Sequence, residues 1–186
     1  MRKWVVIYSS VTGNTKEIAA EIAAEAGAES FRVQDAPADL SDYDVVALGY
    51  WLRRGGPDDL MRAYLPRMTG SRVVLFQTHG TDVGSEHAVT SFARAAYLLG
   101  ADCEILGTFS VQGKLAPALI ERRKKSDPND THMSPEAQER WQRAASHPDA
   151  DDRAAARTFV RKMEHKMDLL EKFQKAQETR KNKAKT

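Results

Sequence analysis

A cluster of small polar residues lies near the N-terminus, between an apolar run and a helical pattern. Residues 10–15 read Ser-Val-Thr-Gly-Asn-Thr and follow the apolar stretch 3–8. Glycine lets the backbone approach a ligand closely, and backbone N–H groups at a helix start attract anions. The cluster therefore predicts a phosphate-binding loop. Its side-chain donors would be Ser10, Thr12, Asn14 and Thr15.

This loop lacks two common nucleotide-binding patterns. The P-loop of nucleotide triphosphatases needs G-x-x-x-x-G-K-[ST], and no lysine occurs here before Lys16. The G-x-G-x-x-G pattern of dinucleotide-binding proteins is absent from the loop as well. The structural alternative is a turn that only caps a helix, which is the usual role of Ser, Thr, Gly and Asn.

Apolar runs alternate with helical patterns over residues 1–112. This alternation predicts an α/β fold, in which a parallel sheet is covered by helices on both faces. Ligands of such sheets bind beyond the carboxyl ends of the strands, where the polar loop would lie. Strands are expected at 3–8, 30–33, 44–50, 72–78 and 103–111, and helices at 14–26, 57–68 and 85–100.

The remaining residues, 113–186, predict a helical C-terminal extension. A first helix is expected over 113–125, a second begins after Ser134, and a long amphipathic helix spans about 150–178 before a frayed basic tail. The long helix has an apolar stripe, which predicts packing on the domain, pairing with a second copy, or docking of a redox partner. The stripe consists of Phe159, Met163, Met167, Leu170 and Phe173.

Composition limits the class of protein. The chain has 186 residues, 41% of them hydrophobic, which suffices for one domain with a core. Its single cysteine, Cys103, excludes an internal disulfide, and no leader or membrane-length apolar run is visible, so a cytoplasmic protein without a membrane partner is expected. The net charge of +2 does not favour nucleic acid, and the basic excess is confined to residues 151–186.

The loop at residues 10–15, placed directly after Val-Val-Ile-Tyr, resembles the phosphate-binding loop of flavodoxins, S/T-x-T-G-N-T. The resemblance covers about residues 1–112. It implies flavin mononucleotide (FMN) as the cofactor. It also implies a flavodoxin-like three-layer α/β/α fold, with a five-stranded parallel sheet in the order 2-1-3-4-5 and the cofactor at the switch point of the sheet.

The same resemblance implies which residues contact the flavin. Flavodoxins cover the ring with aromatic side chains from the loops after the third and fourth strands, so Trp51 is the expected stacking residue and Tyr50 the weaker candidate. The later loop departs from the family pattern, because His79 is its only aromatic residue before His87. These two histidines lack the pattern of a metal site. The implied cofactor-binding residues are Ser10, Val11, Thr12, Gly13, Asn14, Thr15, Tyr50, Trp51, Leu52, Gly55, Thr78, His79 and Gly80.

The sequence favours an electron carrier over a catalyst. It contains no recognisable acid–base pair or activated nucleophile, and FMN would carry the electron chemistry. Arg53 or Arg54, beside Trp51, is expected to raise the reduction potential of the flavin. The alternatives are an NAD(P)H-dependent quinone or flavin reductase, and a flavin-free binding or regulatory module on the same fold.

The extension also carries a resemblance. The segments GTFSVQGKL, HMSPE and HPDADDRAAA are similar to those of flavodoxins associated with bilirubin-reducing enzymes. This similarity implies delivery of electrons to a partner reductase, one acting on bilirubin. It further implies that residues 113–150 lie near the flavin, with His132 and His147 as candidate contacts, although both histidines also suit ordinary loop positions.

Overall fold

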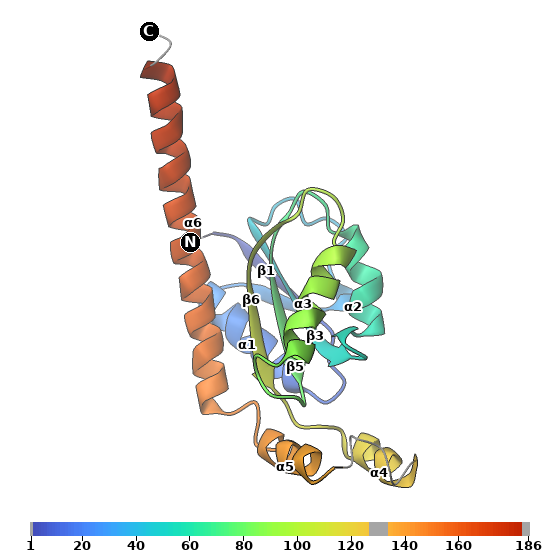
Figure 1. The fold of residues 1–186 in the computed structure, drawn as a ribbon. Coiled ribbons are helices and arrows are strands. Elements are labelled where there is room, and N and C mark those ends of the chain that lie inside the picture. The colour runs from blue at the N-terminus through green and yellow to red at the C-terminus, as the bar shows by residue number, and fades with distance from the viewer. Residues whose placement is uncertain (1, 127–133, 184–186) are drawn as a thin grey trace.

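The structure, a computed structural model, describes residues 2–126 and 134–183 as a three-layer α/β/α fold (Figure 1). Five parallel strands form the sheet in the order β2-β1-β3-β5-β6, which confirms the predicted topology. A sixth strand, β4, pairs antiparallel with the end of β3 and was not predicted. The strands are β1 (Trp4–Tyr8), β2 (Glu29–Arg32), β3 (Val45–Arg53), β4 (Gly56–Pro57), β5 (Arg72–His79) and β6 (Glu104–Gln112).

Six helices accompany the described strands, and they follow the sequence expectations with shifted ends. The helix expected over 57–68 divides into a shorter α-helix and a 3-10 turn, while the last helix continues to Lys183 instead of ending near 178. The helices are α1 (Asn14–Ala26), α2 (Asp59–Tyr64), α3 (Glu86–Leu98), α4 (Pro117–Ser126), α5 (Pro135–Ala144) and α6 (Ala150–Lys183), with 3-10 turns η1 (Val33–Asp35) and η2 (Leu65–Arg67).

Each face of the sheet has its own hydrophobic core. Side chains alternate along β1, so that Val6 packs with α1 and α6 on one face while Ile7 packs with α2 and α3 on the other. Both are fully buried. This double coverage explains the nearly continuous apolar runs in the sequence, since a parallel sheet is buried on both faces.

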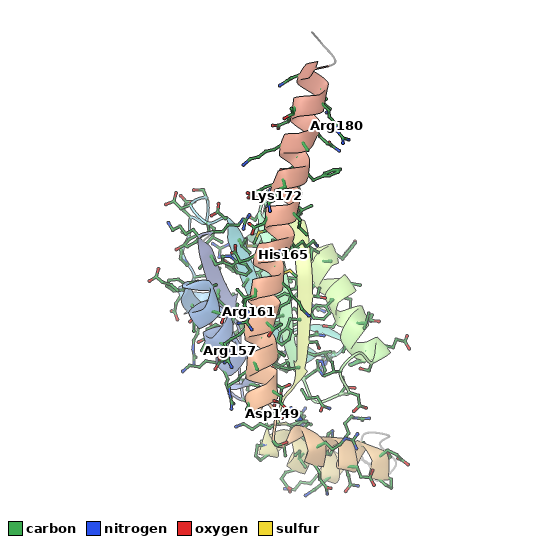
Figure 2. The ribbon with its side chains drawn as sticks, turned by 90° about the vertical axis from the view of Figure 1, so that its left-hand side faces the viewer. Asp149, Arg157, Arg161, His165, Lys172 and Arg180 are labelled. Atoms are coloured by element: carbon green, nitrogen blue, oxygen red, sulfur yellow. The ribbon has the colours of Figure 1, made fainter. Side chains whose placement is uncertain are left out.

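The long helix α6 consists of two different parts. Its first part packs into the core through Phe159 and Met167 and runs parallel to α1. Figure 2 shows the labelled Arg157 and Arg161 along this part, and both form ion pairs with glutamates of α1. Its last part projects beyond the sheet (Figure 1), and there Phe173 is 62% exposed. The predicted apolar stripe therefore packs on the domain only along its first half.

Within residues 2–126 and 134–183, no helix is both long and apolar enough to cross a membrane.

Candidate functional site

The turn from β1 to α1 forms an uncapped helix start. Gly13 precedes the helix in the left-handed region, at φ 92°, where a side chain would be strained. Among the described residues, no side-chain cap bonds the first N–H groups of α1, and Asn14 and Thr15 are its first residues. Free N–H groups at the positive end of a helix are an anion-binding arrangement, so the backbone here can hold a phosphate.

The side chains of this loop also fit a phosphate. The hydroxyl of Ser10 is buried and has no hydrogen-bond partner among the described residues. A buried hydroxyl without a partner costs free energy, and a phosphate oxygen would accept its hydrogen bond. The side chain of Val11, in contrast, is apolar, and the residue is 72% exposed. Within residues 10–15 the donors are therefore backbone N–H groups, hydroxyls and the amide of Asn14, and none of these six residues carries a positive charge.

Thr78 connects the phosphate loop to the neighbouring part of the sheet. Thr78 is the last residue but one of β5, and its side chain is buried. Its Oγ1 lies 2.9 Å from Oγ1 of Thr15. This hydrogen bond joins two of the predicted site residues that are 63 positions apart. The structure thus brings the loop after β1 next to the end of β5. Both lie at the carboxyl edge of the sheet, where the sequence analysis expects the site.

Trp51 lies within β3, not in the loop after it. It pairs with Thr78 in the sheet register and is partly exposed. The guanidinium of Arg53 lies 6.0 Å from the centre of the Trp51 ring and forms an ion pair with Asp59. The strand continues because Leu52 and Arg53 pair with β4 in a hairpin.

Tyr50 occupies the opposite face of the same strand. It is fully buried in the core beside α2 and α3, and its hydroxyl accepts a hydrogen bond from Ser91 at 3.4 Å. Burial raises its pKa. Alternation along β3 consequently places Tyr50 and Trp51 on different faces, with Trp51 on the α1 side together with Thr78.

The hairpin between β3 and β4 turns through Arg54 and Gly55. Both residues have positive φ, 50° and 77°, the combination found in tight type I′ hairpins. Arg94 of α3 donates hydrogen bonds to the carbonyls of Arg54 and Gly55, each at 3.1 Å. The turn is therefore held against α3. A role for Gly55 in contacting the flavin stays a prediction.

His79 is buried and fully engaged in hydrogen bonds. Nδ1 lies 3.1 Å from the carbonyl of Thr81 and donates to it, so Nε2 accepts from the hydroxyl of Ser110 at 2.5 Å. Burial lowers the pKa of His79 to about 4. Its side chain points to the face opposite Thr78, because neighbouring residues of a strand alternate. The structure does not bring the His79 ring beside Trp51.

Two buried polar residues near the loop escaped the sequence analysis. The hydroxyl of Ser9 donates to the buried carboxylate of Asp58, which also accepts from the backbone N–H groups of Leu60 and Met61. These two bonds make Asp58 the cap of helix α2. Its pairing with Ser9 joins positions 49 residues apart, and residue types alone do not specify such a contact.

The extension contributes main-chain contacts to this edge of the sheet. The backbone carbonyl of Lys114 accepts a hydrogen bond from Nδ2 of Asn14 at 2.9 Å. The backbone N–H of Lys114 donates to the carbonyl of His147 at 3.0 Å. Of the two extension histidines predicted as contacts, His147 approaches through its backbone, whereas His132 lies outside the described residues. Gly113 is the residue that could have indicated this approach, since an isolated glycine in a strand pattern is typical of close backbone contact.

His147 also belongs to a small polar cluster at the start of α6. Its Nδ1 lies 2.5 Å from a carboxylate oxygen of Asp152, and Asp149 is close by. Asp149 accepts hydrogen bonds from the backbone N–H groups of Asp151 and Asp152. The hydrogen bond from Asp152 is the main cause that lowers the pKa of Asp149. The carboxylates here serve as a helix cap.

Comparison with known proteins places this geometry in a family. The model for the flavodoxin domain matches residues 5–161. A flavodoxin-like domain-containing protein BilS of Clostridioides difficile is 31% identical over 176 residues, which cover 90% of this chain and 99% of that protein. The BilS protein of Clostridium symbiosum is 22% identical, over 85% and 94% of the two chains.

Solved structures share the fold. Oxidised flavodoxin 2 of Bacillus cereus aligns with a TM-score of 0.52 and 20% identity, over 88% of this chain and 99% of that chain. A flavoprotein of Lactobacillus acidophilus in complex with FMN aligns with a TM-score of 0.50 and 16% identity, over 67% of this chain and all of the other. The sheet order, the uncapped loop after β1 and these matches lead to one conclusion: this chain belongs to the flavodoxin-domain family.

Proposed function

We propose that this protein binds FMN and carries electrons to a partner reductase. The observation that carries the proposal is the loop at residues 10–15, where an uncapped helix start and the unpartnered hydroxyl of Ser10 lie together. Family membership supports the same cofactor. The flavoprotein of Lactobacillus acidophilus, which shares the fold, was solved in complex with FMN. When bound, FMN supplies the electron chemistry.

The residues of this chain would bind and orient the cofactor. The N–H groups of α1, with Ser10 and Thr15, would hold the phosphate, and Trp51 would cover the ring. Backbone groups of residues 78–80 would hold the ring edge. Arg53 lies next to Trp51 and forms an ion pair with Asp59, and the expectation that it raises the reduction potential of the flavin stays a prediction.

The proposed acceptor is a reductase that acts on bilirubin. Two observations support it: the relatives with nearly full-length matches are named BilS, and the extension resembles that of flavodoxins associated with bilirubin-reducing enzymes. The cytoplasmic location expected from composition stays a prediction.

The experiment supplies FMN-loaded protein with NADPH, first alone with a quinone, then with a flavodoxin reductase, a bilirubin reductase and bilirubin. We expect bilirubin reduction only in the complete mixture. Direct NADPH consumption with the quinone would instead establish the reductase alternative. A protein that takes up no FMN would establish the flavin-free alternative.

We also propose that the last part of α6, residues 169–183, pairs with a second copy of the chain. Leu169 and Phe173 lie one turn apart and are 51% and 62% exposed, which supports an apolar contact there. The double variant Leu169→Glu and Phe173→Glu should halve the mass in solution. A wild-type protein that is already monomeric would refute this pairing.

A further inference from the structure

The chain leaves β6 through a short segment, Gly113–Leu115, that crosses the carboxyl edge of the sheet between the two cofactor loops. The N–H of Gly113 donates to the carbonyl of His79 at 2.8 Å. The next carbonyl, of Lys114, accepts from Nδ2 of Asn14 at 2.9 Å. One segment therefore bonds the loop that follows β1 and the end of β5.

The approach on the phosphate side is too close for a side chain at residue 113. A Cβ added to Gly113 would lie 2.4 Å from Nδ2 and 3.0 Å from Cβ of Asn14. Real Cβ atoms do not reach the first distance, and the second atom is fixed to the backbone of α1. An alanine at this position would therefore displace Asn14 or the segment.

The contact on the other side involves a side chain of the segment itself. A Cβ added to Gly80 would lie 2.3 Å from Cδ1 of Leu115, which is the flexible end of that side chain and can move. Of the two glycines, Gly113 is therefore the one whose replacement would disturb an atom fixed to the backbone. Asn14 is 5% exposed, and its Oδ1 has no hydrogen-bond partner among the described residues. The bond from Nδ2 to Lys114 consequently fixes which end of the amide is left for a ligand.

The rest of the extension is attached at the same place. Lys114 donates its N–H to the carbonyl of His147, and the His147 ring bonds Asp152 at the start of α6. Arg143 of α5 also forms an exposed ion pair with Asp82, at 3.4 Å, in the loop after β5. Figure 1 shows α4 and α5 beyond the carboxyl ends of the strands, on the side of the candidate site.

We propose that Gly113–Leu115 is a clamp that positions both cofactor loops and couples FMN binding to the placement of the extension. Gly113 is a positioning residue in it, because it acts through Asn14. This inference rests on FMN as the cofactor but not on electron delivery. Coupling between two sites is reciprocal. FMN must therefore stabilise the position of the clamp by the same free energy by which the clamp strengthens FMN binding.

The test uses the full chain and measures hydrogen exchange of the Gly113 and Lys114 amides with and without FMN. The matched variants are Gly113→Ala and Gly107→Ala. The second adds a methyl within β6, the strand that leads into the segment, but there its nearest neighbour would be the flexible end of Met163. FMN affinity and the melting temperature of the FMN-free protein are measured for both.

We expect FMN to slow exchange at both amides in the wild-type protein. Gly113→Ala should bind FMN about tenfold more weakly than Gly107→Ala, since overpacking at a ligand loop costs on the order of 1.4 kcal/mol. Equal affinities of the two variants, or exchange at both amides that FMN leaves unchanged, would overturn the clamp. Failure of wild-type protein to bind FMN would refute the cofactor itself, and normal FMN binding without bilirubin reduction would refute only the proposed acceptor.

Discussion

The phosphate side and the ring side of the candidate site are built in different ways. The phosphate side comes from one continuous stretch, residues 10–15, in which Gly13 and the start of α1 supply the geometry. The ring side consists of residues from β3 and β5. The register between these two strands determines which side chains lie next to each other there. The difference shows that main-chain anion binding is a local property, whereas coverage of a ring depends on long-range pairing.

This difference has a direct consequence for His79 and Trp51. Both are aromatic residues near strand ends, and the sequence offers no reason to separate them. The register pairs Trp51 with Thr78, so alternation turns His79 to the other face, where Ser110 and Thr81 take up both ring nitrogens. The structure therefore assigns His79 a role in holding the loop after β5.

The largest expected effect tests this structural role of His79. Its pKa in the folded protein is about 4, against 6.5 when exposed. Between these values the unfolded chain binds a proton and the folded chain does not. Stability is therefore complete above about pH 6.5 and falls by up to about 3 kcal/mol as the pH drops to 4. Denaturant unfolding across this range measures the loss.

Carboxylates that become protonated also reduce stability as the pH falls. The variant His79→Gln separates their contribution from that of His79, because it removes the titration of the imidazole and leaves the carboxylates in place. Its stability should fall less steeply than that of the wild-type protein between pH 6.5 and 4. His165, exposed on α6 and labelled in Figure 2, provides the control His165→Gln, which should retain the wild-type slope. Identical slopes for all three proteins would contradict a buried neutral His79.

The next effect tests the ring side. Trp51→Ala should weaken FMN binding by about 2 kcal/mol, roughly 30-fold, because stacking on an aromatic ring contributes about 1–3 kcal/mol. Fluorescence titration of FMN measures it. Tyr97→Ala is the control, since Tyr97 is 90% exposed on α3, away from the site. If both variants bind FMN equally well, another residue covers the ring.

Most of the fold could be predicted because its signals are local. The helix expected at 14–26 begins and ends at those residues, as the polar loop before it and Gly27 after it indicate. The last residues of β3 were missed because burial ends there while pairing with β4 continues. The turn at Arg54 lacks the Asn-Gly or Asp-Gly signal of a hairpin, so the short strand went unrecognised.

The candidate site could be predicted only where it is continuous in sequence. The contacts of Asn14 with Lys114 and of Thr15 with Thr78 join positions 100 and 63 residues apart. Residue types alone do not specify such pairs. The apolar stripe of α6 was likewise visible, but its division into a buried and a projecting half depends on where the sheet ends.

The smallest effect isolates the backbone of the phosphate side. Gly13 and Gly70 both have positive φ, 92° and 60°, and a Cβ at either would have no heavy atom within 4 Å. Alanine at each position therefore adds backbone strain of about 1 kcal/mol without a clash. Both variants should lose similar stability, but only Gly13→Ala should also bind FMN several-fold more weakly, since only its strain is in the loop proposed to hold the phosphate. Equal FMN affinities, by the same titration, would mean that the conformation of Gly13 serves the fold and leaves anion binding to the side chains.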